Sequence, residues 1–161
     1  MECLPQEYLR SQGTLDTLKE HYGINVRRHS LYPNLCLLKY DLIDSPDVDP
    51  LVKQCRSIIL DEANNWNIVS WPMNRFFNLG QNGADSLDLE STKVYEKLDG
   101  SICILYYYDN QWHVSTSGSP DAGGEVEGLQ KVTYKELFWK TFLDDLKYRL
   151  PDNKNICYFF E

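Results

Sequence analysis

Long hydrophobic runs are missing from this sequence. No apolar stretch has the length needed to cross a bilayer, and the amino terminus carries Glu2 and Pro5 where a secretory signal needs basic and then apolar residues. Internal repeats and low-complexity tracts are also absent. The lack of a bilayer-spanning or signal segment predicts a soluble, cytoplasmic protein with no membrane partner.

Histidine is scarce, and no cysteine belongs to a Cys-x-x-Cys pair. The three histidines lie far apart, so their spacing supports neither a zinc site nor a Cys/His catalytic pair. The odd number of cysteines argues against a complete disulfide framework and favours a reducing compartment. The residues concerned are His21, His29, His113, Cys3, Cys36, Cys55, Cys103 and Cys157.

Positive charge is in short supply as well. The chain has 16 Lys and Arg against 24 Asp and Glu, a formal net charge of −8. Because cationic contacts to phosphate supply most non-specific nucleic-acid affinity, any nucleic-acid role must depend on a local patch. The small cluster Arg27-Arg28-His29 is interpreted as solvated surface.

What the chain does have is enough apolar material for a core. Its 161 residues are 42% hydrophobic and 13% aromatic, which predicts one folded domain at most. Turn residues and apolar periodicity indicate a helix followed by antiparallel strands. We expect a helix at 14–22 that stops at Gly23, and strands at 35–40, 56–60, 68–71, 102–108 and 112–117, with a loop at 45–50.

The last part of the chain predicts one more helix and one more strand. Thr133 and Glu136 form a capping box, and Phe138, Phe142 and Leu146 lie one turn apart on the expected inner face, with Pro151 as the end. A strand is expected at 155–161. We therefore predict an α+β domain of antiparallel sheets with peripheral helices. A hydrophobic strand that ends at a charged residue would have only part of its backbone hydrogen-bond partners. We therefore expect the chain to be a fragment.

The most informative motif is Lys97-Leu98-Asp99-Gly100-Ser101. It follows the strand-like residues 94–96 and precedes the apolar segment 102–108. A strand that breaks at Asp-Gly can hold one amine at the floor of a pocket, while a residue without a side chain lets a ligand come close. The alternative is an ordinary hairpin with a solvated lysine. Lys-x-Asp-Gly is also the nucleotidyl-acceptor signature of ATP-dependent ligases and capping enzymes.

Residues 31–161 resemble the phage-type RNA ligases that repair tRNA, the RNA ligase 1 group of covalent nucleotidyltransferases. Four blocks match in order, and the combination of the second with the third is far more specific than either alone. They are Gln54-Cys55-Arg56 with Ile58-Ile59-Leu60, then residues 72–79 (PMNRFFNL), then residues 96–101 (EKLDGS), and finally Phe160-Glu161. The resemblance implies that residues 1–161 are the amino-terminal part of an antiparallel-sheet nucleotidyltransferase core of the ATP-grasp-like ligase kind.

The same resemblance implies how ATP is handled. Lys97 would attack the α-phosphate of ATP and keep AMP as a phosphoramidate. Only a neutral amine is a nucleophile, so a lysine with the usual pKa of about 10.4 needs desolvation or nearby cations. Arg56, Arg75 and bound Mg²⁺ would provide this nearby positive charge and offset the negative charge on the triphosphate. The competing role for Arg75, next to Phe76 and Phe77, is snorkelling over aromatic core.

Five further residues acquire roles from the resemblance. Gly100 would let the backbone pass the nucleotide, and Asp99 would orient the lysine or a metal-bound water; a simple Asp-Gly turn is the alternative for both. Tyr40 and Phe77 would lie at the nucleotide, with core packing as the alternative. Glu161 would accept from the ribose hydroxyls or hold a metal-bound water, unless it is merely a solvated terminal residue.

Three positions depart from the resembled pattern. Ser57 stands where glycine usually follows the arginine, Trp71 replaces an arginine, and Ser117 occupies a place that holds lysine in some members. The later motifs, with paired lysines that draw ATP into the reactive geometry, are not within these 161 residues. We expect a carboxy-terminal remainder or a partner chain to supply them, and feeble self-adenylation without them.

The leading hypothesis is the front half of an ATP-dependent RNA ligase. The complete form would join a 5′-phosphate to a 3′-hydroxyl through lysyl-AMP and RNA-adenylate, using ATP and Mg²⁺ to repair tRNA or another broken structured RNA. A ligase-derived module that binds nucleotide or RNA without catalysis remains open, as does a DNA ligase or capping enzyme, although those should lack the Phe-Phe-Asn block.

Overall fold

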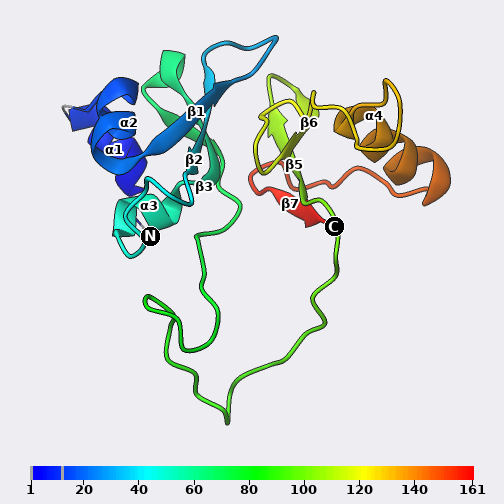
Figure 1. The fold of residues 1–161 in the computed structure, drawn as a ribbon. Coiled ribbons are helices and arrows are strands. Elements are labelled where there is room, and N and C mark those ends of the chain that lie inside the picture. Colours follow the sequence, from blue (N-terminus) through cyan, green and yellow to red (C-terminus); the bar gives the residue numbers. More distant parts are fainter. Residues whose placement is uncertain (1, 12) are drawn as a thin grey trace.

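Two antiparallel sheets packed face to face, with helices on both outer sides, form the body of the protein (Figure 1). The computed structural model describes residues 2–11 and 13–161. The first sheet has the strand order β1-β2-β3-β4 and the second has the order β6-β5-β7. The predicted α+β class with antiparallel sheets and peripheral helices is therefore confirmed.

The first sheet is built from four strands that are consecutive in the sequence. They are β1 (Ile24–Arg28), β2 (Leu35–Tyr40), β3 (Arg56–Asp61) and β4 (Asn67–Ser70). The 3-10 turn η1 (Glu62–Asn64) connects β3 to β4, with Asn65 in the left-handed conformation. Because every residue of β2 from Leu35 to Leu38 is buried, this strand is covered on both faces.

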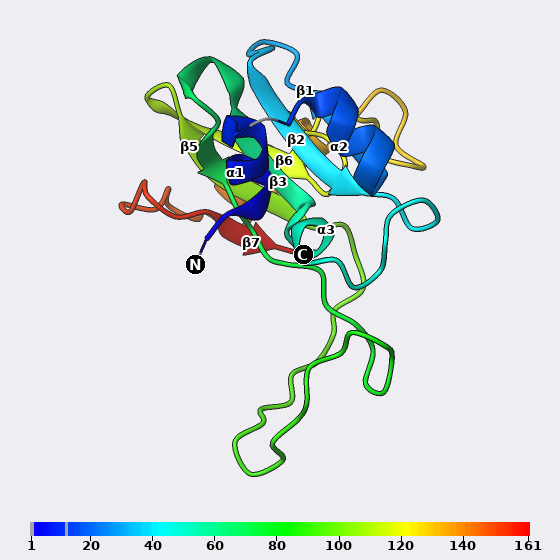
Figure 2. The same ribbon diagram turned by 90° about the vertical axis from the view of Figure 1, so that its left-hand side faces the viewer.

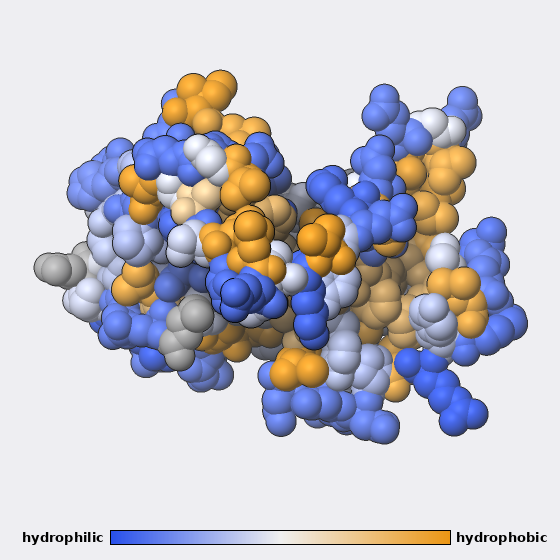
Figure 3. Space-filling view, turned by 90° about the horizontal axis from the view of Figure 1, so that it is seen from below, coloured by the Kyte–Doolittle hydropathy of each residue, from blue (hydrophilic) through white to orange (hydrophobic). Residues whose placement is uncertain are grey.

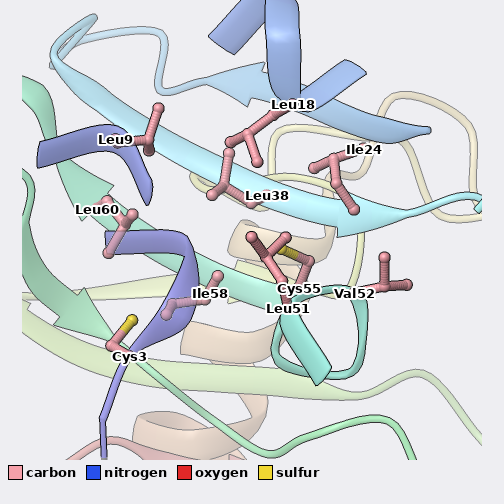
Figure 4. Packing of buried hydrophobic residues seen from close by; sticks show 10 residues of the cluster. All are labelled: Cys3, Leu9, Leu18, Ile24, Leu38, Leu51, Val52, Cys55, Ile58 and Leu60. Carbon is pink, nitrogen blue, oxygen red and sulfur yellow. The ribbon is translucent and has the colours of Figure 1, made fainter. Parts of the chain in front are cut away.

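Three short helices cover the outer face of the first sheet: α1 (Leu4–Ser11), α2 (Leu15–Tyr22) and α3 (Pro50–Gln54). Thr14 caps α2 through Thr17, and Gly23 ends it with φ of 64°. Leu18 of α2 packs with Leu38 and Ile58 of the sheet in one apolar cluster (Figure 4). No helix among the described residues has the length and apolar character to cross a membrane.

The second sheet consists of β5 (Cys103–Tyr108), β6 (Gln111–Thr116) and β7 (Tyr158–Phe160). Its outer face packs on α4 (Tyr134–Trp139) and the π-helical turn η2 (Lys140–Asp145). Phe138 and Phe142 stack with ring centroids 5.4 Å apart and contact Phe160 of β7. This aromatic packing holds α4 against the second sheet. Figure 1 shows α4 beside that sheet, at the right-hand side of the view.

Side chains from both sheets meet in a third apolar cluster. Leu35, Leu37 and Ile59 of the first sheet contact Tyr106 of the second. The Tyr106 hydroxyl donates to the carbonyl of Pro120 over 2.7 Å, so its polar atom is satisfied within the core. The layers are thus helices, sheet, sheet and helix.

Residues 71–102 connect the two sheets and project away from the body (Figure 2). No strand forms between Ser70 and Cys103, so the strand-like interpretation of residues 94–96 is wrong. The physical reason is that residues 85–101 are exposed along their whole length and have no neighbouring strand to pair with. Alternating or apolar residues alone do not form a strand without a partner.

Most of the predicted elements are confirmed, with differences at their ends. The final strand is limited to β7, and the last helix ends before Pro151 in the π-helical turn. Phe138 and Phe142 are buried as predicted, but Leu146 is 52% exposed because the π-helical turn ends at Asp145. Sequence reasoning missed α1 and β1, and it treated residues 45–50 as loop without recognising that Asp49 caps α3.

Candidate functional site

A cleft of about 510 Å³ lies between the two sheets, at the ends of β2, β3 and β6. It brings together four of the eight predicted site residues: Tyr40, Arg56, Gly100 and Glu161. Its remaining lining residues are Lys39, Ser57, Ser101, Ile102, Thr116, Ser117, Gly118 and Tyr134. We refer to this set as the inter-sheet cleft. Two cations and one carboxylate line it, so a polar ligand with negative charge suits it.

A β-bulge in β3 turns Arg56 toward the inter-sheet cleft. Leu38 of β2 pairs with Ile58, but the next residue, Lys39, pairs with Arg56, which leaves Ser57 as the extra residue. Ser57 has φ of 70°, in the left-handed region. Without the bulge, strand alternation would place Arg56 on the same face as Ile58, among the helices. The backbone conformation of Ser57 thus explains why glycine suits this position.

The Arg56 side chain is half-buried and rests on the segment that follows β4. Its guanidinium carbon lies 4.3 Å from the ring centroid of Phe76, in a cation–π arrangement. Nη1 lies 3.2 Å from the Met73 sulfur. Both contacts involve the block 72–79, so this block positions Arg56. The guanidinium has no salt bridge among the described residues, which leaves its charge available to a ligand.

Arg75, Tyr40 and Phe77 come together beside the cleft rather than within it. The Arg75 guanidinium carbon lies 4.4 Å from the Tyr40 ring centroid and 4.9 Å from that of Phe77. Nη2 forms a 2.8 Å salt bridge with Asp47, and the side chain is only 8% exposed. Nη1 has no hydrogen-bond partner in the described part of the chain. Neither Arg75 nor Phe77 lines the inter-sheet cleft, so in this conformation Arg75 covers aromatic rings, the competing role considered above.

Gly100 and Glu161 touch each other at the wall of the cleft. A methyl group built on Gly100 would lie 3.3 Å from Cγ of Glu161. Such a contact is tighter than most methyl contacts in proteins, so a side chain here would push on the carboxylate. The pairing brings two motifs that lie about sixty positions apart to one place, and it explains why a residue without a side chain suits position 100.

Lys97 and Asp99 lie outside the inter-sheet cleft. Both are exposed, in the last part of the projecting segment. Lys97 lies three positions before Gly100, a separation of about 10 Å in an extended chain. The structure therefore places Lys97 close to the cleft along the chain, but not at the floor of the cleft. The catalytic role of Lys97 stays a prediction, as does the orienting role of Asp99.

Sequence reasoning missed three cleft residues with polar side chains: Lys39, Thr116 and Tyr134. For Lys39 a signal existed. Leu35 and Leu37 point between the sheets, and the period of two places Lys39 on the same face. Nothing in the sequence marked Tyr134, which reaches the site because the capped start of α4 lies beside Ser101, with 3.4 Å between their oxygens.

A second cleft of about 600 Å³ adjoins the first and is lined mainly by apolar residues of α4, η2 and β7. It shares Ser101, Tyr134 and Glu161 with the inter-sheet cleft. Figure 3 shows hydrophobic residues gathered on this side of the molecule. Because it holds no cation among the described residues, it is a poorer place for phosphate than its neighbour.

Two buried histidines lie between the sheets, outside both clefts. The rings of His29 and His113 meet edge to face with centroids 5.7 Å apart. His29 Nδ1 accepts from the backbone amides of Leu31 and Tyr32. Burial lowers the pKa of His29 and of His113, because the charged imidazolium loses its hydration. Nearby, burial favours a higher pKa for Asp121, but hydrogen bonds from Ser30 and Ser119 outweigh it and lower that pKa.

Comparison with known proteins identifies the family. The sequence profile of a family described as "RNA ligase" matches residues 54–156. An RNA ligase of Rhodothermus phage RM378 is 34% identical over 140 residues, covering 66% of this chain and 31% of the relative. The chain belongs to the phage-type RNA ligase 1 family.

A second relative comes from an insect virus. A protein of Autographa californica nuclear polyhedrosis virus, named "Putative bifunctional polynucleotide kinase/RNA ligase", is 30% identical over 139 residues, covering 80% of this chain and 20% of the relative. The chain thus spans about a third and a fifth of the lengths of these two relatives. No solved structure matches the chain.

Proposed function

We propose that this chain is the nucleotide-binding part of an ATP-dependent RNA ligase. The complete protein joins a 5′-phosphate to a 3′-hydroxyl of broken RNA, such as tRNA, through lysyl-AMP and RNA-adenylate. The observation that carries the proposal is the meeting of Arg56, Gly100 and Glu161, from three separate family motifs, at one cleft between the sheets. In this proposal the two sheets and their helices are the first part of a nucleotidyltransferase core of the ATP-grasp-like kind.

Lys97 supplies the nucleophile. Its neutral amine attacks the α-phosphorus of ATP, a nitrogen–phosphorus bond forms, the bond to the β-phosphate oxygen breaks, pyrophosphate leaves, and the amine loses a proton. For this step the segment that carries Lys97 has to bring the side chain to the cleft that Gly100 already lines. Arg56 supports the step by offsetting charge on the phosphates.

The carboxylate of Glu161 fits a role at magnesium. Mg²⁺ usually takes one or two carboxylates together with substrate phosphates and water, rather than a cage of protein ligands. Glu161 is the carboxylate of the cleft, and no group of three or more His, Cys, Asp or Glu side chains gathers elsewhere among the described residues. Bound Mg²⁺ would neutralise phosphate charge there, and Glu161 would hold it directly or through water.

A binding module without catalysis is the second candidate. The exposed position of Lys97 outside the cleft favours it, because a module needs only the cleft and not the lysine. RNA would then be held near the nucleotide without being joined. The two candidates differ in whether a covalent bond forms between the chain and AMP.

Labelling with ATP distinguishes the two candidates. The protein, alone and with any chain that follows it in its reading frame, is incubated with ATP labelled at the α-phosphate and Mg²⁺. Label that stays on the denatured protein and in alkali, that hot acid releases as expected of a phosphoramidate, and that is lost in Lys97→Ala, supports the ligase. Lys93→Ala, an exposed lysine of the same segment, is the matched control and should keep the label. Binding without covalent label supports the module, and absence of ATP binding contradicts both.

A further inference from the structure

Lys39 and Arg56 lie directly opposite each other on adjacent strands. They form the last pair between β2 and β3, after the bulge, and both line the inter-sheet cleft. Like charges placed opposite each other in an antiparallel pair destabilise a sheet. Neither side chain has a salt bridge among the described residues. An anion between them would remove the repulsion, so the pair has the character of an anion-binding site.

The Lys39 amine also reaches across the cleft to β6. Its Nζ lies 3.9 Å from the place that a methyl group on Gly118 would take. Gly118 follows Ser117, the position that holds lysine in some members of the resembled family. At this end of the cleft the end of β6 and the residue after it therefore offer hydroxyl groups, from Thr116 and Ser117, but no cation. The amine at this end of the cleft is that of Lys39, which belongs to the first sheet.

We propose that Lys39 supplies from β2 the positive charge that position 117 lacks, and that it binds the polyphosphate of ATP together with Arg56. The inference depends on the proposed function, since it names a contact within the same nucleotide site. Lysine suits this role because its ammonium is a point charge on a long stem and reaches phosphate from a neighbouring strand. The absence of a side chain on Gly118 leaves room for the amine beside β6.

Equilibrium binding without turnover tests the inference. ATP, inorganic tripolyphosphate and adenosine are titrated separately into the protein in buffer with EDTA, so that neither Mg²⁺ nor adenylation contributes. The variants are Lys39→Gln, Ser117→Lys and the combination of both. Lys19→Gln, which removes an exposed lysine of α2, is the matched control for net charge. Thermal unfolding of each variant reports on folding.

We expect Lys39→Gln to weaken binding of ATP and of tripolyphosphate by about tenfold, the typical value of one charge-assisted contact. Adenosine binding should not change, and Lys19→Gln should bind all three compounds as the wild type does. Adding Ser117→Lys to Lys39→Gln should restore most of the lost affinity, because the charge returns to the same end of the cleft from β6.

Three results would overturn the inference. Unchanged ATP affinity in Lys39→Gln would show that the amine does not contact phosphate, while Lys97-dependent labelling would still support the ligase. An equal loss for adenosine would show a general structural effect. Failure of Ser117→Lys to restore binding would show that a cation at position 117 cannot replace the charge of Lys39. If the wild type binds no ATP at all, the proposed function fails together with the inference.

Discussion

The Ser57 hydroxyl donates a 2.8 Å hydrogen bond to the backbone carbonyl of Ser117. The bond joins the bulge of β3 to the residue that follows β6, so it ties the two sheets together at the mouth of the cleft. Both residues are positions at which this chain departs from the family pattern it resembles. The two positions are thus structurally connected, since the Ser57 hydroxyl binds the main chain of Ser117.

Replacing Ser57 tests the bulge. Ser57→Ala should destabilise the protein by about 1 kcal/mol through loss of the hydrogen bond. Ser57→Gly should be about 1 kcal/mol more stable than the alanine variant, because glycine adopts a positive φ without strain. Denaturant unfolding measures both. Ser70→Ala is the control, since that buried hydroxyl has no hydrogen-bond partner within residues 2–11 and 13–161. An alanine variant at least as stable as the glycine variant would contradict the left-handed backbone at Ser57.

The contact between Gly100 and Glu161 predicts an effect on ligand binding rather than on folding. In Gly100→Ala the new methyl has to displace the Glu161 side chain by a few tenths of an ångström. We expect ATP affinity to fall by a few-fold to about tenfold, with the unfolding temperature unchanged because both residues are exposed. In Gly124→Ala the methyl would lie 4.0 Å from the Tyr134 ring, and binding should not change. Equal ATP affinities in the two variants would show that Glu161 does not take part in ATP binding.

The buried histidines predict a loss of stability in mild acid. Because the folded pKa of His29 lies below the unfolded value of about 6.5, its contribution is complete above that pH and is lost as pH falls toward the folded pKa. Each such group adds a slope of at most about 1.4 kcal/mol per pH unit. His29→Asn keeps an acceptor for the two backbone amides but binds no proton.

Unfolding free energies measured between pH 7 and pH 5 should therefore fall less steeply in His29→Asn than in the wild type. His21→Asn, which replaces an exposed histidine in the same way, is the comparison variant. A wild-type slope that persists in His29→Asn would mean that another group, such as His113, takes up the proton.

Thiol reactivity should separate one cysteine from the other four. Cys157 is partly exposed, whereas Cys3, Cys36, Cys55 and Cys103 are buried as free thiols. Burial raises the pKa of Cys36 to about 11, so little thiolate exists there at neutral pH. A chromogenic disulfide reagent should label one thiol rapidly in the native protein and all five in denaturant. Cys157→Ser should abolish the rapid phase; a rapid phase that survives would place a second thiol at the surface.

Local signals in the sequence predicted the elements that depend on local physics. The helix at Leu15–Tyr22 carries its own cap and stop, and the strand at Leu35–Tyr40 is apolar throughout. Residues 24–28 were missed because the strand Ile24–Arg28 holds two exposed arginines and gains its pairing only from β2. Residues 94–96 have apolar character but no partner. Strand pairing depends on tertiary contacts, so the local pattern missed the strand at 24–28 and wrongly indicated one at 94–96.

The site was predictable to the extent that its residues lie in motifs. Arg56, Gly100 and Glu161, to which the resemblance gives roles at the nucleotide, line one cleft, and those roles stay predictions. Lys39 was missed because a single lysine at the end of a strand carries no motif, and its role depends on which residues of another sheet it faces. The salt bridge that holds Arg75 to Asp47 was equally hidden, because loop residues 45–49 gave no sign of their distance from the aromatic block.

The extra residue in β3 has a consequence for how the chain tolerates change in length. Deleting position 57 would restore a regular strand in which Arg56 stands directly before Ile58, still pairs with Lys39 and still faces the polar cleft, because adjacent residues of a strand point to opposite faces. Loss of this one codon would thus keep the cation at the cleft, whereas a chain of unchanged length that straightened β3 would turn the Arg56 guanidinium into the apolar layer beneath the helices and bury an unpaired charge.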